Sequence, residues 1–326
     1  MAENRYLVSI SPHRRHGRTI RSMIVTTIAA LVPAAAFGVF QFGLKGALVL
    51  VAGVVTAVAT EAIVNKVANQ PLSISDGHAA LVGLMVGMML PAGAPIYVVV
   101  IAAAAGILVG KMPFGPLGSA PLSPALVGLL IVAISWPTEV NSFAAPKTAA
   151  AELHAADAAP AESPLMAIGI DPSDAADYPI LDLFLGKQAG PVGGISPLLL
   201  LLGGLFLIWR RVSRWQGAVG FLLGVAITAG IAHAMDPGGC APASFHLLTG
   251  LTMFGAFFLC TEWTTTPVTP WGLFLFGLFA GMLTIILRMS ELHFGRVPWA
   301  ITLMTLATPL FDRIAAVPFG KVARHA

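Results

Sequence analysis

Apolar stretches bounded by charged or turn residues recur along the chain, and they predict about ten membrane segments. The expected segments cover residues 20–40, 46–64, 78–90, 96–110, 125–136, 198–209, 216–234, 246–260, 271–287 and 297–310. Two of them, 125–136 and 198–209, are shorter than the roughly 20 apolar residues that cross a bilayer as a helix. Broken or re-entrant segments are therefore expected, and residues 112–121 are the best candidate for a non-helical loop at membrane depth.

The composition excludes a soluble globular protein. Hydrophobic residues make up 57% of the 326 residues and charged residues 10%, whereas soluble domains carry roughly 25% charged residues. The 34 glycines and 24 prolines agree with interrupted membrane helices. Two cysteines, Cys240 and Cys260, cannot supply the four thiolates of an iron–sulfur cluster. Any redox chemistry in this chain therefore needs another cofactor.

The positive charges predict the orientation of the chain. With ten spans and a cytoplasmic N-terminus, 13 of the 18 Lys and Arg residues lie inside, as the positive-inside rule requires. The basic pI of about 9.1 then reflects orientation and gives no support to nucleic-acid binding. The first 19 residues lack an apolar core, so no cleavable signal peptide is expected.

The chain divides into five parts at a long hydrophilic connection. They are a basic cytoplasmic N-terminus (1–19), a first membrane repeat (20–136), a periplasmic acidic loop (137–195), a second membrane repeat (196–313) and a cytoplasmic C-terminus (314–326). The loop holds 8 of the 15 acidic residues. Its Ala/Pro-rich first part is typical of a flexible linker, and residues 165–194 are expected to pack onto the membrane domain.

The two membrane parts share an order of features that predicts an internal repeat. Residues 80–90 and 248–259 are similar Gly-rich stretches. Each is followed by a Pro-containing turn, an apolar span that ends in Lys111 or Arg288, a Gly/Pro loop and a last apolar span. Two repeats of five spans each must be inverted relative to one another. The expected fold is therefore an all-α polytopic membrane protein with two inverted five-helix repeats.

Acidic residues at membrane depth are functional candidates because they are costly there. Glu61 serves an ion pathway or snorkels to the interface. Asp76 caps the third segment or acts as a ligand. Glu262 lies among hydroxyl side chains that bind a polar ligand or satisfy a helix end, and Asp312 is an ion-pathway candidate or pairs with a basic residue such as Arg313.

A charged cluster is expected at the outer end of the ninth segment, and it contains Arg288, Glu291, His293 and Arg296. It either receives an anionic cofactor or a carboxylate of the acidic loop, or it is a solvated face. The histidines lack metal-ligand spacing, so no metal site is expected. The sequence contains no Walker phosphate loop, H-E-x-x-H motif or nucleophile elbow, which argues against ATPases and hydrolases.

In several stretches, in order along nearly the whole chain, the sequence resembles the D subunit of Rnf electron-transport complexes and the B subunit of the sodium-pumping NADH:quinone oxidoreductase. The matching stretches are 75–84, 110–118, 124–128, 246–250, 255–258, 261–262, 286–288 and 309–312. The resemblance implies a urea-transporter-like fold in the bacterial inner membrane, with both termini cytoplasmic. It also implies a multi-subunit complex that couples electron transfer to sodium or proton transport. Its expected partners are the other membrane and soluble subunits, together with membrane lipid.

Members of this family carry an FMN linked to a threonine and a non-covalent riboflavin. Through the resemblance, flavin contacts are assigned to Asp76, Gly77, Lys111, Gly115, Gly118, Thr261, Glu262 and Arg288. The FMN-bearing threonine is replaced here by Asp177 or Tyr178, and no threonine occurs from 149 to 226. We therefore expect covalent FMN to be absent and any flavin, riboflavin or FMN, to be held non-covalently. Met112 stands where sodium-pumping relatives tend to carry an acidic residue, which leaves the coupling ion open.

Three functions fit these observations. The first is a membrane subunit that carries electrons across the membrane through a flavin. The second is a small-solute channel or transporter built on the same fold. The third is a structural anchor that docks soluble redox proteins through Arg210, Arg211 and Arg214. Whole-chain resemblance favours the first.

Overall fold

A computed structural model describes residues 19–69, 74–115, 117–147, 162–170, 175, 178–289 and 296–314. The described residues are mostly helical and contain no β-strand, only an isolated bridge between Pro91 and Pro191. The helices before the long loop are α1 (Ile20–Val67), α2 (His78–Met89), α3 (Ile96–Gly110) and α4 (Pro124–Ser135). Short helices α5 (Pro137–Val140), α7 (Pro164–Ile170) and α8 (Ile180–Leu185) follow. The remaining helices are α9 (Pro197–Trp209), α10 (Trp215–Met235), α11 (Ala243–Leu248), α12 (Thr252–Phe254), α13 (Pro270–Met289), α14 (Arg296–Leu306) and α15 (Thr308–Asp312).

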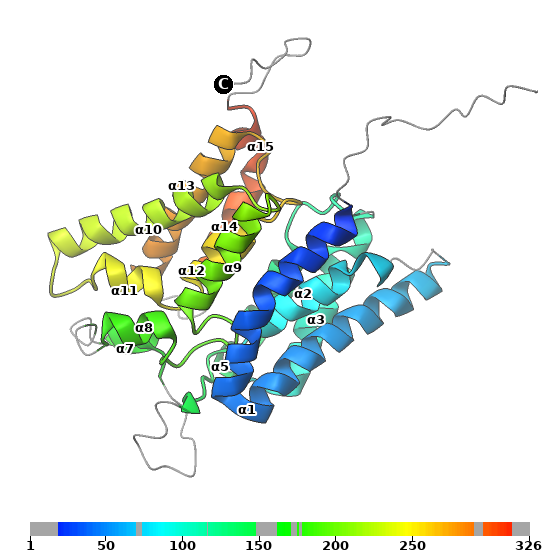
Figure 1. Ribbon diagram of the computed structural model, residues 1–326, viewed down its shortest axis with the longest axis horizontal. Helices are drawn as coiled ribbons and strands as arrows, with labels where there is room; N and C mark the ends of the chain where they lie inside the picture. The colour runs from blue at the N-terminus through cyan, green and yellow to red at the C-terminus, as the bar shows by residue number, and fades with distance from the viewer. Residues whose placement is uncertain are drawn as a thin grey trace, which may run out of the picture.

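Helix α1 is sharply bent at Gly43 and so supplies two of the expected segments. Gly43 has φ 63° and ψ −141°, a backbone conformation that side chains other than glycine's rarely tolerate. The two arms of α1 fold back beside one another, as Figure 1 shows in blue. A single glycine thus replaces an interhelical loop.

Two expected segments of the second half are broken. Residues 246–260, expected as one span, form α11, α12 and a π-helical turn at Gly255–Leu259. The chain leaves helical geometry at Gly250, where φ is +66°. Residues 297–310 are divided between α14 and α15. In the first half, the described residues after the 3₁₀ turn Met112–Phe114 stay non-helical up to Ser123, as expected of the 112–121 loop.

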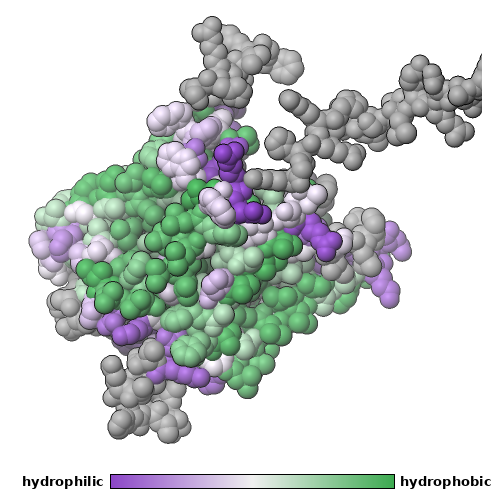
Figure 2. All heavy atoms as spheres, viewed as in Figure 1, coloured by the Kyte–Doolittle hydropathy of each residue, from purple (hydrophilic) through white to green (hydrophobic). Residues whose placement is uncertain are grey.

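The lengths of the helices and the exposed surface are those of a multi-pass membrane protein. Four described helical stretches are long and apolar enough to cross a membrane: Ile20–Val67, Ile96–Phe114, Trp215–Met235 and Pro270–Met289. The shorter apolar helices α2, α4 and α9 pack among them. Large hydrophobic side chains such as Leu44, Val67 and Met235 are more than 70% exposed. Hydrophobic side chains cover most of the face seen in Figure 2, with hydrophilic ones toward its edges.

Glycines allow the helices to approach backbone to backbone. A Cβ on Gly83 of α2 would collide with the Gly53 carbonyl oxygen of α1, and a Cβ on Gly277 of α13 would collide with the Gly217 carbonyl oxygen of α10. Such small-residue contacts are typical of membrane helix pairs, where dispersion and close packing replace the hydrophobic effect. The same device therefore holds α1 to α2 in the first half and α10 to α13 in the second.

The end of the long loop packs between the two halves, as expected for residues 165–194. The backbone N–H groups of Val192 and Gly193 donate to the carbonyl oxygens of Leu90 (2.9 Å) and Met88 (2.8 Å) at the end of α2. Gln188 is buried, and its Nε2 donates to the Ile195 and Leu248 carbonyl oxygens (3.0 and 3.1 Å). This segment satisfies carbonyl groups that the short, broken helices leave open.

Candidate functional site

A buried ion pair joins α1 to the end of α3. Lys111 Nζ lies 2.7 Å from Glu61 Oε1, and the two side chains are 7% and 0% exposed. Lys111 follows the last residue of α3, and Glu61 lies on the second arm of α1. Glu61 therefore does not snorkel to the surface; its charge is neutralised inside the protein, as a buried ion requires.

His78, at the start of α2, extends this polar cluster toward the second half. It is 4% exposed and lines a small cavity with Lys111, Gly115, Gly118 and Thr264. On its other side His78 borders a cavity with Thr261 and Glu262. Polar residues of both halves thus meet at one end of the helices, which we call the Lys111 end.

Several buried polar atoms at the Lys111 end have no hydrogen-bond partner in the described part of the chain. They are His78 Nδ1, Ser123 Oγ, Ser213 Oγ and Glu262 Oε2. Ser123 occupies the N-cap position of α4 without capping it, and its hydroxyl lies beside the Glu262 carboxylate. Buried polar groups are rarely left unsatisfied. These atoms therefore indicate a place for water or a polar ligand.

Other predicted site residues at this end have local structural partners. Asp76 Oδ1 accepts from the His78 backbone N–H (2.7 Å) at the start of α2, so its capping role is confirmed. Gly77, with φ 80°, makes that turn. Thr261 Oγ1 donates to the Phe257 carbonyl oxygen (2.5 Å). Asp312 Oδ1 accepts from the Val268 backbone N–H (2.7 Å) and so attaches α15 to the loop before α13.

Arg288 does not belong to the Lys111 end. It lies at the C-terminal end of α13, whereas Glu262 precedes that helix, and a 20-residue helix is about 30 Å long. Its guanidinium donates to the His246 carbonyl oxygen (2.8 Å), the Thr249 carbonyl oxygen (3.2 Å) and Thr252 Oγ1 (2.7 Å). The eight residues assigned together from the resemblance therefore do not form one site.

The role of Arg288 is to hold the broken helix. The carbonyl groups at the end of α11 have no continuing helix to bond with, and a cation at a helix C-terminus satisfies them. The sequence alone did not point to this role, because the break at Gly250 is a tertiary feature. Gln188, for which the sequence pattern gave no signal, also bonds to a carbonyl oxygen of α11.

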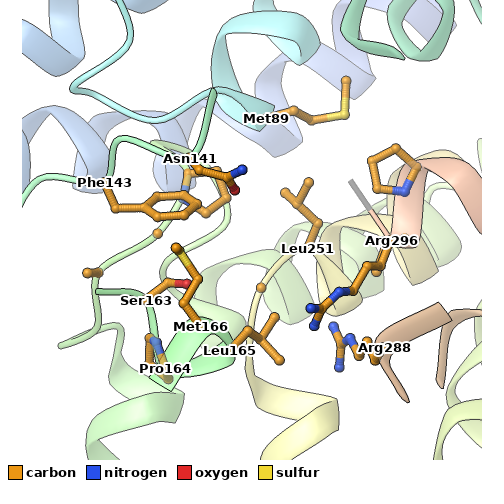
Figure 3. Close-up of a pocket in the computed structure, with 16 residues that line it drawn as sticks. Met89, Asn141, Phe143, Ser163, Pro164, Leu165, Met166, Leu251, Arg288 and Arg296 are labelled. Atoms are coloured by element: carbon orange, nitrogen blue, oxygen red, sulfur yellow. The ribbon is translucent and has the colours of Figure 1, made fainter. Parts of the chain in front are cut away.

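A second cavity, of about 70 Å³, lies at the Arg288 end. Figure 3 shows the guanidinium groups of Arg288 and Arg296 pointing toward the same space near Leu165 and Leu251. Arg288 is only 8% exposed, so the solvated-face interpretation is wrong for this residue. Glu291 and His293, the other members of the expected cluster, lie outside the described residues.

Tyr178, one of the two residues predicted to replace the FMN-bearing threonine, lies in a small apolar cluster. Its ring is 6.1 Å from that of Phe245 on α11, and Leu183 and Ala241 pack in the same cluster. Phe245 in turn contacts His246, next to Arg288. Asp177, the alternative residue for that position, lies outside the described residues.

Long apolar helices with backbone contacts through glycine, broken segments and an apolar surface define a multi-pass helical membrane protein. The chain belongs to the NQR2, RnfD, RnfE family, whose model matches residues 7–320. It is 35% identical over 332 residues to the D subunit of the proton-translocating ferredoxin:NAD(+) oxidoreductase complex of Clostridium ljungdahlii, covering 98% of this chain and 97% of the relative.

Two further relatives extend this similarity. The D subunit of the Na(+)-translocating ferredoxin:NAD(+) oxidoreductase complex of Acetobacterium woodii is 32% identical over 320 residues, covering 96% of this chain and 94% of the relative. The D subunit of the ion-translocating oxidoreductase complex of Salmonella enteritidis is 30% identical over 341 residues, covering 94% and 96%. The relatives differ in the ion named, so the similarity alone does not assign an ion to this chain.

Proposed function

We propose that the chain is a membrane subunit of an Rnf-like, ion-translocating electron-transport complex and that it passes electrons through a flavin held without a covalent bond. The observation that carries this proposal is the buried polar cluster at the Lys111 end, where both halves contribute residues. Family membership supports the complex, and the cluster supports a ligand inside this subunit. The other subunits of the complex are its partners.

The residues at the Lys111 end have the chemistry that a flavin ring requires. The unpartnered Nδ1 of His78 and the Glu262 carboxylate, beside which the Ser123 hydroxyl lies, match the donors and acceptors along the polar edge of an isoalloxazine ring. Phe257 and Phe258 form an apolar wall in the same cavity. That cavity measures about 30 Å³, the scale of water. A flavin must therefore separate the 115–123 loop from the 262–269 loop when it binds.

The roles of the protein groups follow from their surroundings. A bound flavin supplies the electron-carrying chemistry, and the protein sets its position and the local charge. Lys111 lines the adjoining cavity, and Glu61 neutralises its charge. Of the two ion-pathway candidates, Glu61 is fully buried, whereas Asp312 accepts from a backbone N–H.

The absence of covalent FMN is part of the proposal. Asp177 or Tyr178 takes the family's threonine position by the resemblance, and no threonine lies between 149 and 226. The Tyr178 ring packs on Phe245, an environment that supports a packing role. The denatured subunit should show no flavin fluorescence in a gel. A fluorescent band near the 33.8 kDa of this chain would contradict the proposal.

We also propose two inverted five-helix repeats, with the Lys111 end and both termini on the cytoplasmic side of a bacterial inner membrane. The order of the helices supports the repeat, because the two arms of α1, then α2, α3 and α4, can be matched in order with α9, α10, α11–α12, α13 and α14–α15. Basic residues at the Lys111 end support the orientation. Labelling of single introduced cysteines in intact cells tests it: Thr266→Cys should be protected from an impermeant reagent, and Lys147→Cys should react.

The decisive measurement is flavin content in the isolated native complex. Acid extraction should release flavin from this subunit. His78→Ala should reduce the flavin per chain about tenfold, the effect of one lost hydrogen bond of about 1.4 kcal/mol. His233→Ala is the matched control, because His233 bonds to Cys240 at the opposite end. A subunit without any releasable flavin would favour the channel or anchor functions instead.

A further inference from the structure

An open cavity of about 320 Å³ lies at the Lys111 end and adjoins one of the cavities that His78 borders, with which it shares Val212, Thr261 and Trp263. It is enclosed by the start of α1, the turn between α9 and α10, and the loop that precedes α13. Its described lining includes the side chains of Arg211, Arg214 and Trp263 and no acidic residue. The cavity therefore combines two basic side chains with an aromatic ring.

Arg211 occupies a backbone position that normally selects glycine. Helix α9 ends at Trp209, and Arg211 follows with φ 53°. The Arg211 N–H donates to the Ile208 carbonyl oxygen and the Val212 N–H to the Leu207 carbonyl oxygen, both at 2.9 Å. These two bonds define a Schellman motif, in which the left-handed residue is usually glycine. An arginine at such a position is conformationally costly, and such cost is concentrated at functional sites.

Arg214, the residue before α10, contacts the loop that precedes α13. One of its guanidinium N–H groups donates to the Val268 carbonyl oxygen, and the Val268 N–H is bonded to Asp312. Val268, whose carbonyl oxygen accepts from Arg214, is therefore fixed by a hydrogen bond to Asp312 of α15. This anchoring gives the cavity a fixed cationic wall.

The surroundings of the cavity are those of a membrane interface. Met23, Val212 and Leu273 contribute apolar wall beside the arginines. Trp209 and Trp215, at the two sides of the α9–α10 turn, are 76% and 53% exposed. Tryptophans concentrate at the level of lipid headgroups, and basic pockets between membrane helices bind anionic headgroups.

We propose that this cavity binds the headgroup of an anionic phospholipid, with its phosphate between Arg211 and Arg214 and its acyl chains along the apolar surface of α9. A soluble anion would gain nothing from the apolar wall, whereas a lipid uses both parts. The lipid would join the start of α1 to the loops of the second half, so that it stabilises the contact between the halves.

Arg211→Gly tests the proposal without endangering the fold, because glycine is the residue that the Schellman motif prefers. Full-length protein, purified in neutral detergent and delipidated, is titrated with phosphatidylglycerol, with phosphatidylcholine or with inorganic phosphate. Native mass spectrometry counts the bound lipid. Wild-type protein should bind one phosphatidylglycerol in preference to phosphatidylcholine, and Arg211→Gly should weaken it about fivefold, the effect expected of one basic residue near a lipid surface.

Arg210→Gln is the matched control, since it removes the same charge from the same turn but is not part of the cavity wall. It should bind phosphatidylglycerol like the wild type. Equal weakening by both substitutions would show a diffuse charge effect and overturn the site. Unchanged binding in Arg211→Gly would overturn it as well. Competition by inorganic phosphate at equal concentration would reassign the cavity to a soluble anion.

Discussion

Lys111 and Arg288 are comparable in sequence and differ in how the fold neutralises them. Each lies at the end of a membrane helix that precedes a loop, and each is close to a buried histidine, His78 or His246. Lys111 is paired with the carboxylate of Glu61, whereas Arg288 bonds to backbone carbonyl groups and to a hydroxyl.

This difference shows that the same problem, a cation at the end of a membrane helix, has two solutions. The intact helices around Lys111 offer few carbonyl groups that are not already bonded within a helix. A carboxylate must therefore supply the countercharge for Lys111. The break after α11 exposes carbonyl groups that a forked guanidinium satisfies at several points. The ion pair of Lys111 and Glu61 is locally neutral. The bonds from Arg288 to the end of α11, which we call the Arg288 clamp, leave a positive charge beside the cavity of Figure 3.

The largest expected effect comes from separating the ion pair. Glu61→Gln leaves the buried ammonium of Lys111 without a countercharge, and we expect a loss of about 3–5 kcal/mol in unfolding free energy. Unfolding in mixed micelles measures this. The double variant Glu61→Gln/Lys111→Met should recover most of the loss, because no buried charge remains. Equal instability of the single and double variants would contradict a pairing role.

Arg288 should behave differently, since its described partners are carbonyl groups, a hydroxyl and a histidine ring, with no carboxylate among them. Arg288→Met should lower the unfolding free energy by about 2–3 kcal/mol, because the carbonyl groups of α11 lose their donors. Arg288→Lys keeps the positive charge but lacks the forked guanidinium. Its unfolding free energy should lie between those of the wild type and Arg288→Met. Hydrogen exchange of residues 246–252 locates the effect. If it appears elsewhere, the clamp is not the reason.

Helix contacts provide a third comparison, between two glycines in the second half. Gly277→Ala places a methyl group against the Gly217 carbonyl oxygen and should cost about 1–3 kcal/mol through overpacking. Gly230→Ala, on α10 with open space around it, should stabilise by up to about 1 kcal/mol. Thermal unfolding in the same detergent measures both. Similar shifts in one direction would argue against close packing of α10 on α13.

The smallest effect is expected for the exposed pair of Lys187 and Asp182. Their charged atoms are 3.0 Å apart, but the side chains are 49% and 38% exposed. Lys187→Gln should change the unfolding free energy by less than about 1 kcal/mol. A loss as large as that of Glu61→Gln would show that burial is not what distinguishes the two pairs.

Much of the fold could be predicted from local patterns, and the failures have physical causes. Apolar stretches bounded by charged or turn residues located the helices to within a few residues, and Gly and Pro density indicated broken segments. The joining of segments 20–40 and 46–64 into a bent helix depends on φ at Gly43, and the break in 246–260 depends on φ at Gly250. Neither value can be read from the residue type, because glycine permits both helical and left-handed backbone.

The candidate site was predicted in part. Lys111, Gly115, Gly118, Thr261 and Glu262 were named from the resemblance, and they border adjoining cavities. Arg288 lies at the opposite end of α13 from this group, and its assignment as a flavin contact stays a prediction. The alternative roles of Glu61 could not be separated either, because its partner is 50 residues away.

The sequence by itself determined a multi-pass helical membrane protein of the NQR2, RnfD, RnfE family, because hydrophobicity and motif order are local properties of the chain. Only the tertiary structure decided which charges are paired, which helix ends remain open and which residues of the two halves share a cavity. Burial, countercharge and unsatisfied hydrogen-bonding groups are properties of neighbours in space. These properties therefore exist only in the folded chain and cannot be read from the order of residue types.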